Sequence, residues 1–240
     1  MQSFTQSALA GLRTSLPLII GYFPVAVAFG ISATSIGLSQ LDATLISIII
    51  FAGASQFAFI GLLAEGTSAL TAVLVVIGLN LRHLLYSTSI SPSLKSLTLK
   101  QKLTTAFGMT DEVFASAFSL LKGIPKENRW SWLIGLEFGA YASWIIGTWV
   151  GVSSGDLLLE QFGFLKPALA FALPALFLSL LLPMLVSVRT SGSLFRNRTL
   201  ITIVSAMLIA FTANAVGLAT LGIFGAALIS PLLALWLGDK

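Results

Sequence analysis

Residues 199–238 read TLITIVSAMLIAFTANAVGLATLGIFGAALISPLLALWLG, a run of 40 positions without one charged side chain. A helix needs about 20 apolar residues to cross the hydrocarbon core of a bilayer, so this stretch predicts two membrane-spanning helices. We place the turn between them near Asn214 to Gly222. Isolated strands would leave backbone groups unsatisfied in lipid, which makes helices the expected element.

Other charge-free stretches each give one further expected span: residues 14–41, 43–64, 66–81, 138–155 and 167–188. We extend the third to Ser87 and begin the fourth near Trp130. The sequence therefore predicts an all-α integral membrane protein. Its expected architecture is a polytopic bundle of about seven transmembrane helices, forming a single transmembrane domain over residues 1–240.

The composition of the whole chain agrees with this class. The 240 residues include 13 Lys and Arg but only 9 Asp and Glu, 56% are hydrophobic, and the mean hydropathy is +0.97. Charged residues make up 9% of the chain, against about 25% in an ordinary soluble domain. Such a chain cannot build a polar surface, which excludes a water-soluble enzyme, a disordered protein and a nucleic-acid binder with a basic face.

The sequence lacks the residues and motifs that several kinds of catalytic or metal site require. There is no cysteine for a disulfide or a thiolate, and a single histidine cannot build a histidine-rich metal site. The chain has no phosphate-binding Gly-x-x-x-x-Gly-Lys-Ser/Thr loop and no His-Glu-x-x-His zinc motif. We therefore expect no cofactor, no metal and no enzymatic activity.

Basic residues gather in loops at Lys95, Lys100, Lys102, Lys122, Lys126, Arg129, Arg189, Arg196 and Arg198. The positive-inside rule places these loops in the cytoplasm, as expected for a multi-pass protein of the cell inner membrane. Residues 103–121 carry basic flanks on both sides and two acids at their centre. This segment is therefore expected to be re-entrant or interfacial. The side of the N-terminus stays open, because Arg13 opposes the outside placement that counting backward gives.

The order of the spans suggests an internal repeat. Residues 15–90 and 130–217 each hold three expected spans, and residues 91–129 connect them. A three-span unit repeated across a connector that does not cross is inverted in the membrane. Such repeats are common in secondary transporters.

Polar or helix-breaking residues in the first two spans indicate a site. Pro24 removes a backbone hydrogen bond, which favours either a broken helix that binds a carboxylate or ammonium, or an ordinary kink. Gly53, Ser55 and Gln56 lie deep in the second span. They form either a packing seam with one interhelical hydrogen bond or a neutral polar surface for a small zwitterion.

The third span ends with Asn80, His83 and Tyr86 on roughly one helix face. Arg82 beside them is expected either to reach the cytoplasmic interface or to pair with an acid. His83 titrates near physiological pH and is a candidate for accepting a proton during transport.

Asp111 and Glu112 are adjacent acids in an otherwise apolar run. Adjacent helical residues point in different directions, so one is expected to meet substrate or Arg82 and the other water. The alternative is an interfacial helix with two solvated acids.

The fourth span places Glu137, Tyr141, Trp144 and Thr148 on one helical stripe. An intramembrane glutamate is a functional candidate, although an interfacial structural role is the alternative. Two pairs of glycines suit close helix packing: Gly135/Gly139 and Gly147/Gly151.

At this point a family resemblance becomes specific. The chain resembles the AzlC family over about residues 10–215, most clearly in GYFPVA (21–26), FAGASQF (51–57), NLRHLLYS (80–87) and TDEVF (110–114). The resemblance implies the large subunit of a two-component permease that exports branched-chain amino acids across the bacterial inner membrane. It further implies coupling to the proton gradient and a small multispan membrane partner of the AzlD type.

Combining the residues with this resemblance gives a midplane site. The candidates for substrate binding are Pro24, Gly53, Ser55, Gln56, Asn80, Asp111 and Glu112. The candidates for proton coupling are His83, Asp111 and Glu137. The substrate carboxylate is expected at backbone N–H groups near Pro24 and Gly53, and the ammonium at an acid or Gln56. Phe51, Phe57 and neighbouring apolar residues would cover valine, leucine or isoleucine, and methionine as well, because an apolar pocket separates such side chains only modestly.

Two other functions stay open at this stage. The chain could be a structural or assembly subunit whose partner carries the substrate pathway. Such a scaffold should tolerate neutral substitutions at Gln56, Asp111 and Glu137. An intramembrane serine protease would need Ser55 within hydrogen-bond reach of His83, which the sequence alone does not show.

Overall fold

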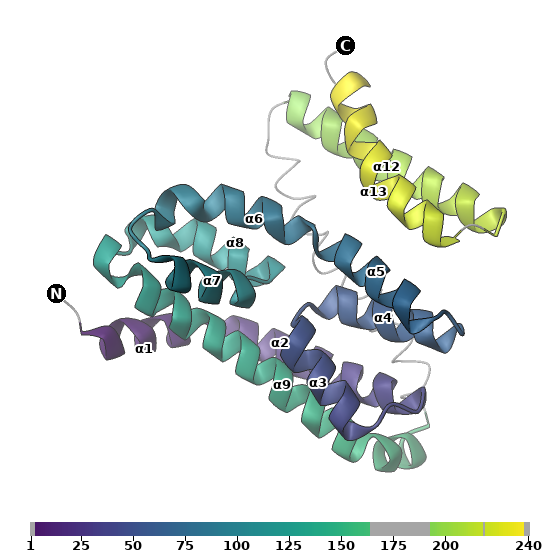
Figure 1. The fold of residues 1–240 in the computed structure, drawn as a ribbon, viewed down its shortest axis with the longest axis horizontal. Helices are drawn as coiled ribbons and strands as arrows, with labels where there is room; N and C mark the ends of the chain where they lie inside the picture. Colours follow the sequence, from purple (N-terminus) through teal and green to yellow (C-terminus); the bar gives the residue numbers. More distant parts are fainter. Residues whose placement is uncertain (1–2, 164–192, 218, 238–240) are drawn as a thin grey trace. The chain divides into compact units, whose positions relative to one another are not determined.

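The computed structural model describes residues 3–163, 193–217 and 219–237, and every regular element in these ranges is helical. This confirms the all-α prediction. The chain divides into two compact units, Met1–Leu176 and Phe177–Lys240. Figure 1 shows the helices of both units. Whether they form the one expected transmembrane domain stays a prediction.

The described part of the first unit contains α1 (Phe4–Thr14), α2 (Leu16–Ser35), α3 (Gln40–Ile50), α4 (Gly53–Ala64), α5 (Ala69–Asn80), α6 (Arg82–Ile90), α7 (Leu99–Gly108), α8 (Asp111–Leu120) and α9 (Arg129–Gln161). Within the described residues, the helical stretches long and apolar enough to cross a membrane are Leu16–Ser35, Ala69–Leu94 and Lys126–Gly155. They correspond to the first, third and fourth expected spans.

The described part of the second unit is a helical hairpin of α12 (Ser193–Ala215) and α13 (Ala219–Leu237). Its turn includes Gly217, whose φ of 76° suits glycine. The turn expected near Asn214 to Gly222 is thereby confirmed. The span expected over residues 167–188 lies outside the described residues, as does part of the second proposed repeat. The total of about seven spans and the inverted repeat stay predictions.

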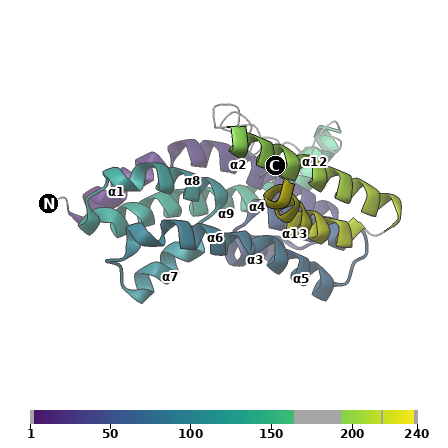
Figure 2. The same cartoon turned by 90° about the horizontal axis from the view of Figure 1, so that it is seen from above.

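Helix α9 is the axis of the first unit (Figures 1 and 2). Its 33 residues give a length of about 50 Å at 1.5 Å per residue, well beyond the roughly 30 Å hydrocarbon core. Helices α1 and α2 follow each other along one side of α9, and α3 and α7 also pack on it. Residues that are distant in the sequence are therefore gathered along one helix.

Glycines on α9 allow this close packing. A Cβ atom at Gly135 would lie 1.9 Å from the carbonyl oxygen of Ala8, and one at Gly151 would lie 2.2 Å from that of Val27. No side chain fits in such a gap, so the backbones of α1 and α2 rest directly on α9. The packing role expected for these glycines is confirmed.

Helix α2 runs without interruption through Pro24, which is exposed on its surface. Of the two alternatives for Pro24, the broken helix is not found, and the proline lies inside a continuous helix. Membrane helices tolerate proline because neighbouring groups satisfy the freed carbonyl.

A correction concerns the single helix expected over residues 43–64. The structure divides it into α3 and α4 at Phe51 and Ala52. Phe51 has a φ of 36° and a ψ of 50°, in the left-handed region that costs a non-glycine residue about 1–2 kcal/mol. Helix α3 starts at a capping box formed by Ser39 and Asp42, so its N-terminus is fixed while its C-terminus is broken.

Residues 103–121 are also interrupted. Helix α7 ends at Gly108, Met109 leaves the helical conformation, and α8 begins after Thr110. The re-entrant or interfacial placement expected for this segment stays a prediction. Within the described part of the first unit, α3–α4 and α7–α8 are therefore interrupted helical segments.

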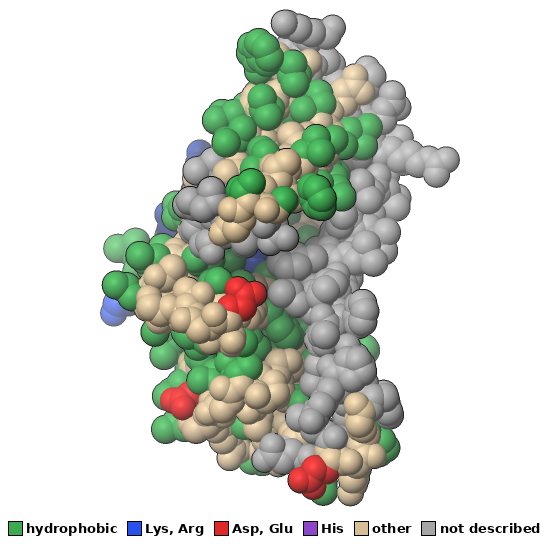
Figure 3. Space-filling model, turned by 90° about the vertical axis from the view of Figure 1, so that its right-hand side faces the viewer, with side chains coloured by type: hydrophobic (Ala, Val, Ile, Leu, Met, Phe, Trp, Pro, Cys, Tyr) green, Lys and Arg blue, Asp and Glu red, His purple; other side chains and the backbone are tan. Residues whose placement is uncertain are grey.

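Large apolar side chains cover much of the described surface (Figure 3). Ile20, Leu70, Leu74 and Phe211 are among the exposed ones. Charged side chains are sparse in the same view. Such a surface is stable against lipid and not against water.

Candidate functional site

The two interruptions meet at the side chain of Tyr22 on α2. Its ring makes edge contacts with Phe51, at 6.5 Å between centroids, and with Trp144, at 5.4 Å. Its hydroxyl donates to Glu112 Oε2 at 2.5 Å and lies 2.6 Å from Thr110 Oγ1. We call these five residues the Tyr22 cluster. They join α2, both interruptions and α9 in one buried or largely buried group.

A polar network holds the first interruption in place. Gln56 accepts a hydrogen bond from the backbone N–H of Ala52 at 3.3 Å and donates one to Ser47 at 2.8 Å. The hydroxyl of Ser47 lies 2.8 Å from that of Thr148 on α9. Gln56 is fully buried and engaged at both ends of its amide. Its polar atoms therefore support the backbone at the interruption.

The C-terminus of α3 is tied to α9 as well. The hydroxyl of Tyr141 donates to the carbonyl oxygen of Ile48 at 2.9 Å, which satisfies a group that the interruption leaves without a helical partner. The ring of Tyr141 makes an edge contact with Phe51 at 4.9 Å between centroids.

The N-terminus of α4 carries no side-chain cap, because the residue before it is Ala52. Its first-turn N–H groups and the positive end of the helix dipole suit a carboxylate. Gly53 begins this turn beneath Trp144, and a Cβ atom there would lie 2.6 Å from the indole ring. Ser55 in the same turn donates to Asn80 Oδ1 at 2.6 Å, which links α4 to the end of α5.

The two adjacent acids at the second interruption point in different directions. Asp111 pairs with Arg82 at 3.0 Å and also accepts a hydrogen bond from Tyr86. Glu112 is bonded to Tyr22 instead of facing water. The expected pairing of Arg82 is found, whereas the expected solvated acid is not.

Tyr86 and His83 of α6 lie next to the second interruption. Tyr86 stacks on Phe114 with 4.6 Å between ring centroids, and the His83 ring lies 5.6 Å from that of Tyr86. The three residues on this common helix face therefore make contacts close to one another: Asn80 with Ser55, His83 with Tyr86, and Tyr86 with Asp111.

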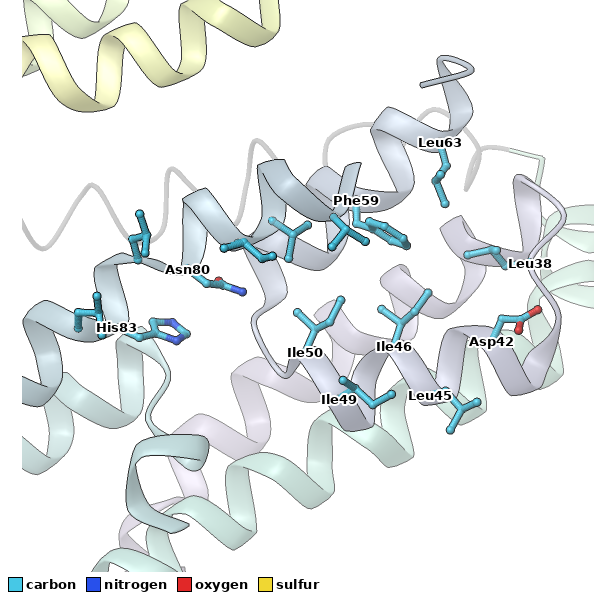
Figure 4. Close-up of a pocket in the computed structure, with 15 residues that line it drawn as sticks. Leu38, Asp42, Leu45, Ile46, Ile49, Ile50, Phe59, Leu63, Asn80 and His83 are labelled. Atoms are coloured by element: carbon cyan, nitrogen blue, oxygen red, sulfur yellow. The ribbon is translucent and has the colours of Figure 1, made fainter. Parts of the chain in front are cut away.

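An apolar pocket of about 800 Å³ opens between α3, α4, α5 and α6 (Figure 4). Aliphatic residues such as Ile46, Ile50 and Val76 form most of its wall. Asn80 and His83 line one end, and Asp42 lines the other. Because Asn80 is also bonded to Ser55, the pocket adjoins the first turn of α4.

Glu137 and the three residues that share its stripe on α9 all contact the interrupted segments. Thr148 lies against Ser47. Trp144 lies against Gly53, and Tyr141 packs on Phe51. Glu137 itself is buried beside Gly108, at the end of α7. The stripe expected from the sequence is confirmed as one continuous contact face.

The structure thus brings together most of the sequence candidates. Around the two interruptions lie Gly53, Ser55, Gln56, Asn80, Asp111 and Glu112. Pro24 does not join them. Sequence reasoning missed Tyr22, although a tyrosine inside an apolar span was a usable signal. Among the described residues, no group of three or more His, Asp or Glu side chains is placed to hold a metal ion.

Comparison with known proteins identifies the relatives of this chain. The family described as AzlC protein matches residues 17–158. The chain belongs to the AzlC family. The matched range of this AzlC-family chain covers α2 to most of α9, and therefore both interruptions and the Tyr22 cluster.

Individual relatives of the AzlC-family chain are membrane proteins. It is 45% identical to the inner membrane protein YgaZ of Escherichia coli over 72% of this chain and 71% of the relative. It is 40% identical to an uncharacterized membrane protein of Archaeoglobus fulgidus over the full length of both. It is 26% identical to the branched-chain amino acid transport protein AzlC of Bacillus subtilis, over 68% of this chain and 62% of the relative.

No solved structure matches the chain. Its family, its relatives and its apolar helices of spanning length assign it to the cell membrane as a multi-pass protein of a transport family. The inner-membrane prediction is confirmed.

Proposed function

We propose that this protein exports branched-chain amino acids across the inner membrane, driven by the proton gradient and together with a small AzlD-type membrane subunit. Its substrates are valine, leucine and isoleucine, with methionine as a further candidate. Support comes from membership of the AzlC family and from a relative that is named a branched-chain amino acid transport protein.

One observation supports this function above the others. Two interrupted helical segments from different parts of the chain meet at Tyr22. Interrupted helices place unpaired backbone groups and helix dipoles inside a membrane protein, where transporters bind small charged substrates. A zwitterion needs a site for an anion and a site for a cation close together, and the two interruptions supply both.

The substrate carboxylate would bind at the first turn of α4, where Gly53 and Ser55 lie and no side chain caps the helix. The ammonium would bind at the carboxylates of Asp111 and Glu112 on α8. Both acids now have partners, so we expect substrate to replace the Tyr22 or Arg82 contact. Gln56, which holds the backbone at the interruption, becomes a positioning residue.

The branched side chain would extend into the apolar pocket beside Ile50 and Asn80. This pocket meets the first turn of α4 through the hydrogen bond from Ser55 to Asn80. A wall of aliphatic side chains favours apolar substrates and separates those differing by one methylene by only about 10- to 200-fold. Valine, leucine and isoleucine should therefore compete with one another.

The decisive experiment uses inverted vesicles that contain this chain with and without its small partner. An imposed pH gradient should drive uptake of labelled leucine, because the cytoplasmic face then points outward. Vesicles with the partner alone provide the control for the rival assembly role. Uptake by the partner alone, or uptake in none of the three preparations, would contradict the proposal.

A further inference from the structure

Glu137 is the buried acid that the zwitterion site does not use. It lies in α9, its side chain is 5% exposed, and its Oε1 has no hydrogen-bond partner among the described residues. By contrast, Asp111 and Glu112 each have a described partner. Glu137 therefore differs in kind from the other two acids of the first unit's interior.

The neighbours of Glu137 are small or neutral. Its Cβ, Cγ and Cδ lie so close to Gly108 that a Cβ atom at Gly108 would be 2.8 Å from each. Thr105, one turn earlier in α7, is 1% exposed, and its hydroxyl also lacks a partner within the described residues. On the α1 side, Ala8 and Ser15 pack on the glycines that flank Glu137 along α9.

The charged and titratable side chains of the surrounding elements are engaged elsewhere or exposed. Arg13 of α1 is exposed, as are Lys100 and Lys102 of α7. Asp111 of α8 is paired with Arg82, and Glu112 with Tyr22. On α9 itself, Arg129 donates to the carbonyl oxygens of Ile124 and Ser93, and Tyr141 donates to that of Ile48. None of these described groups forms an ion pair with Glu137.

A carboxylate in such surroundings is unfavourable, because burial removes its hydration and no described cation or donor replaces it. The same group is stable there as a neutral carboxylic acid. The packing around Glu137 thus selects the proton-loaded form. A different arrangement of α7, which opens the site to water or to a donor, would favour release.

We propose that Glu137 binds the transported proton and that this conformation is the loaded one. Loss of the proton converts the carboxylic acid into a carboxylate and one proton, which passes to water. The carboxylate then disfavours the close contact with Gly108 and shifts the population toward a displaced α7. Helix α7 leads directly into the interruption at Met109 and Thr110. Protonation of Glu137 therefore influences the conformation of the acids on α8 that would bind the substrate ammonium.

This proposal rests on the proposed function for the identity of the cargo and for the coupling of its transport to protons. It also distinguishes between the three sequence candidates for proton coupling. Asp111 is held by Arg82 and Tyr86, and His83 lines the open pocket. Glu137 alone of these three combines burial with an unpartnered oxygen among the described residues.

The test compares wild-type protein with Glu137→Gln and with Glu65→Gln, which makes the same chemical change at an exposed acid after α4. Infrared difference spectra of the reconstituted protein at neutral pH report protonated carboxyl groups. The wild-type band should lose a component in Glu137→Gln and be unchanged in Glu65→Gln. Glu137→Asp keeps the acid, so it should shift this component without removing it, and it provides a second variant if the glutamine protein does not fold.

Transport supplies the second readout. In Glu137→Gln, accumulation of labelled leucine under a pH gradient should fall by at least about tenfold, while leucine exchange without a gradient persists. An unchanged carboxyl band, or gradient-driven accumulation equal to wild type, would overturn the role of Glu137. If wild type carries no branched-chain amino acid but the band component is still lost, the proposed cargo fails and the proton site stands.

Discussion

The hydroxyl of Tyr22 is the smallest group that joins the two interrupted segments, since it contacts both Thr110 and Glu112. These partners lie 88 and 90 positions away in the sequence. A tyrosine in an apolar span shows that a hydrogen-bond partner is needed, but not which one. For this reason the acids were predictable as candidates, whereas the residue that organises them was not.

We expect Tyr22→Phe to preserve the ring contacts with Phe51 and Trp144 and to leave Glu112 without its donor. An unsatisfied buried group costs about 1–3 kcal/mol, and we expect leucine transport to fall by the matching factor of about 5 to 150. Transport per mole of reconstituted protein is the measurement. Ser119→Ala removes an exposed hydroxyl on α8 and should leave the rate unchanged. Equal rates for Tyr22→Phe and wild type would show that the Tyr22 cluster is not part of the pathway.

Gly53 offers a second test at the residue scale. A Cβ atom there would lie 2.6 Å from the Trp144 ring, so Gly53→Ala should displace the indole from the first interruption. We expect a destabilisation of about 1–3 kcal/mol, the usual cost of overpacking. Gly61 lies in the same helix with open space around it, so Gly61→Ala is the matched control. Thermal unfolding in detergent should separate the two variants. A Gly53→Ala midpoint at or above that of Gly61→Ala would contradict the contact.

At the scale of elements, the spans were predictable and their interruptions were not. Residues 43–64 contain neither a charge nor a proline, and the small and polar residues Gly53, Ser55 and Gln56 were interpreted as a packing seam or a polar surface, so the break at Phe51 was not predicted. Pro24 carries the stronger sequence signal and yet lies in a continuous helix. Tertiary contacts stabilise the break at Phe51, because Gln56 and Tyr141 form hydrogen bonds with backbone groups that the break leaves without helical partners.

Helix α1 was not predicted, because it lies outside the long apolar stretches. Its 11 residues are too few and too polar for a membrane span, so hydropathy alone does not predict this helix. Ser3 and Gln6 form a reciprocal capping box at its start, and this local pattern predicts a helix from the sequence alone.

The Arg82–Asp111 pair connects α6 to α8, and we expect it to be cooperative. Asp111→Asn leaves the guanidinium half-buried without its charge partner, whereas Arg82→Gln with Asp111→Asn removes both charges. The double variant should therefore be more stable than the sum of the single effects predicts, with a coupling of about 0.5–3 kcal/mol. A double-mutant cycle by thermal unfolding measures this quantity. Strict additivity would mean that the 3.0 Å contact contributes nothing to stability.

At the scale of the whole molecule, composition alone was sufficient to predict the class. A chain with 9% charged residues and 56% hydrophobic residues cannot cover a soluble core with polar side chains, and long apolar helices satisfy their own backbone groups in lipid. The arrangement around α9 was only partly predictable. Glycine pairs indicated that α9 packs closely, but small residues do not specify which helix approaches them.

The close contact between α1 and α9 should be sensitive to a single methyl group. Gly135→Ala would place a carbon 1.9 Å from the carbonyl oxygen of Ala8, so the helices must separate along this stretch. We expect a clearly lower unfolding temperature, whereas Gly123→Ala, with open space around it, should have almost none of this effect. Unfolding temperatures of the two purified variants provide the comparison. Matching temperatures would mean that α1 does not rest on α9.

The length of α9 makes the bilayer itself a determinant of conformation. A helix of about 50 Å is longer than a hydrocarbon layer of about 30 Å, so α9 must tilt or extend beyond this layer. Both interrupted segments pack on α9, α7–α8 near Glu137 and α3–α4 near Thr148. Any change in the tilt of α9 therefore moves both interrupted segments together. Lipids of different chain length would change this tilt and so alter the conformation of the protein without a bound ligand.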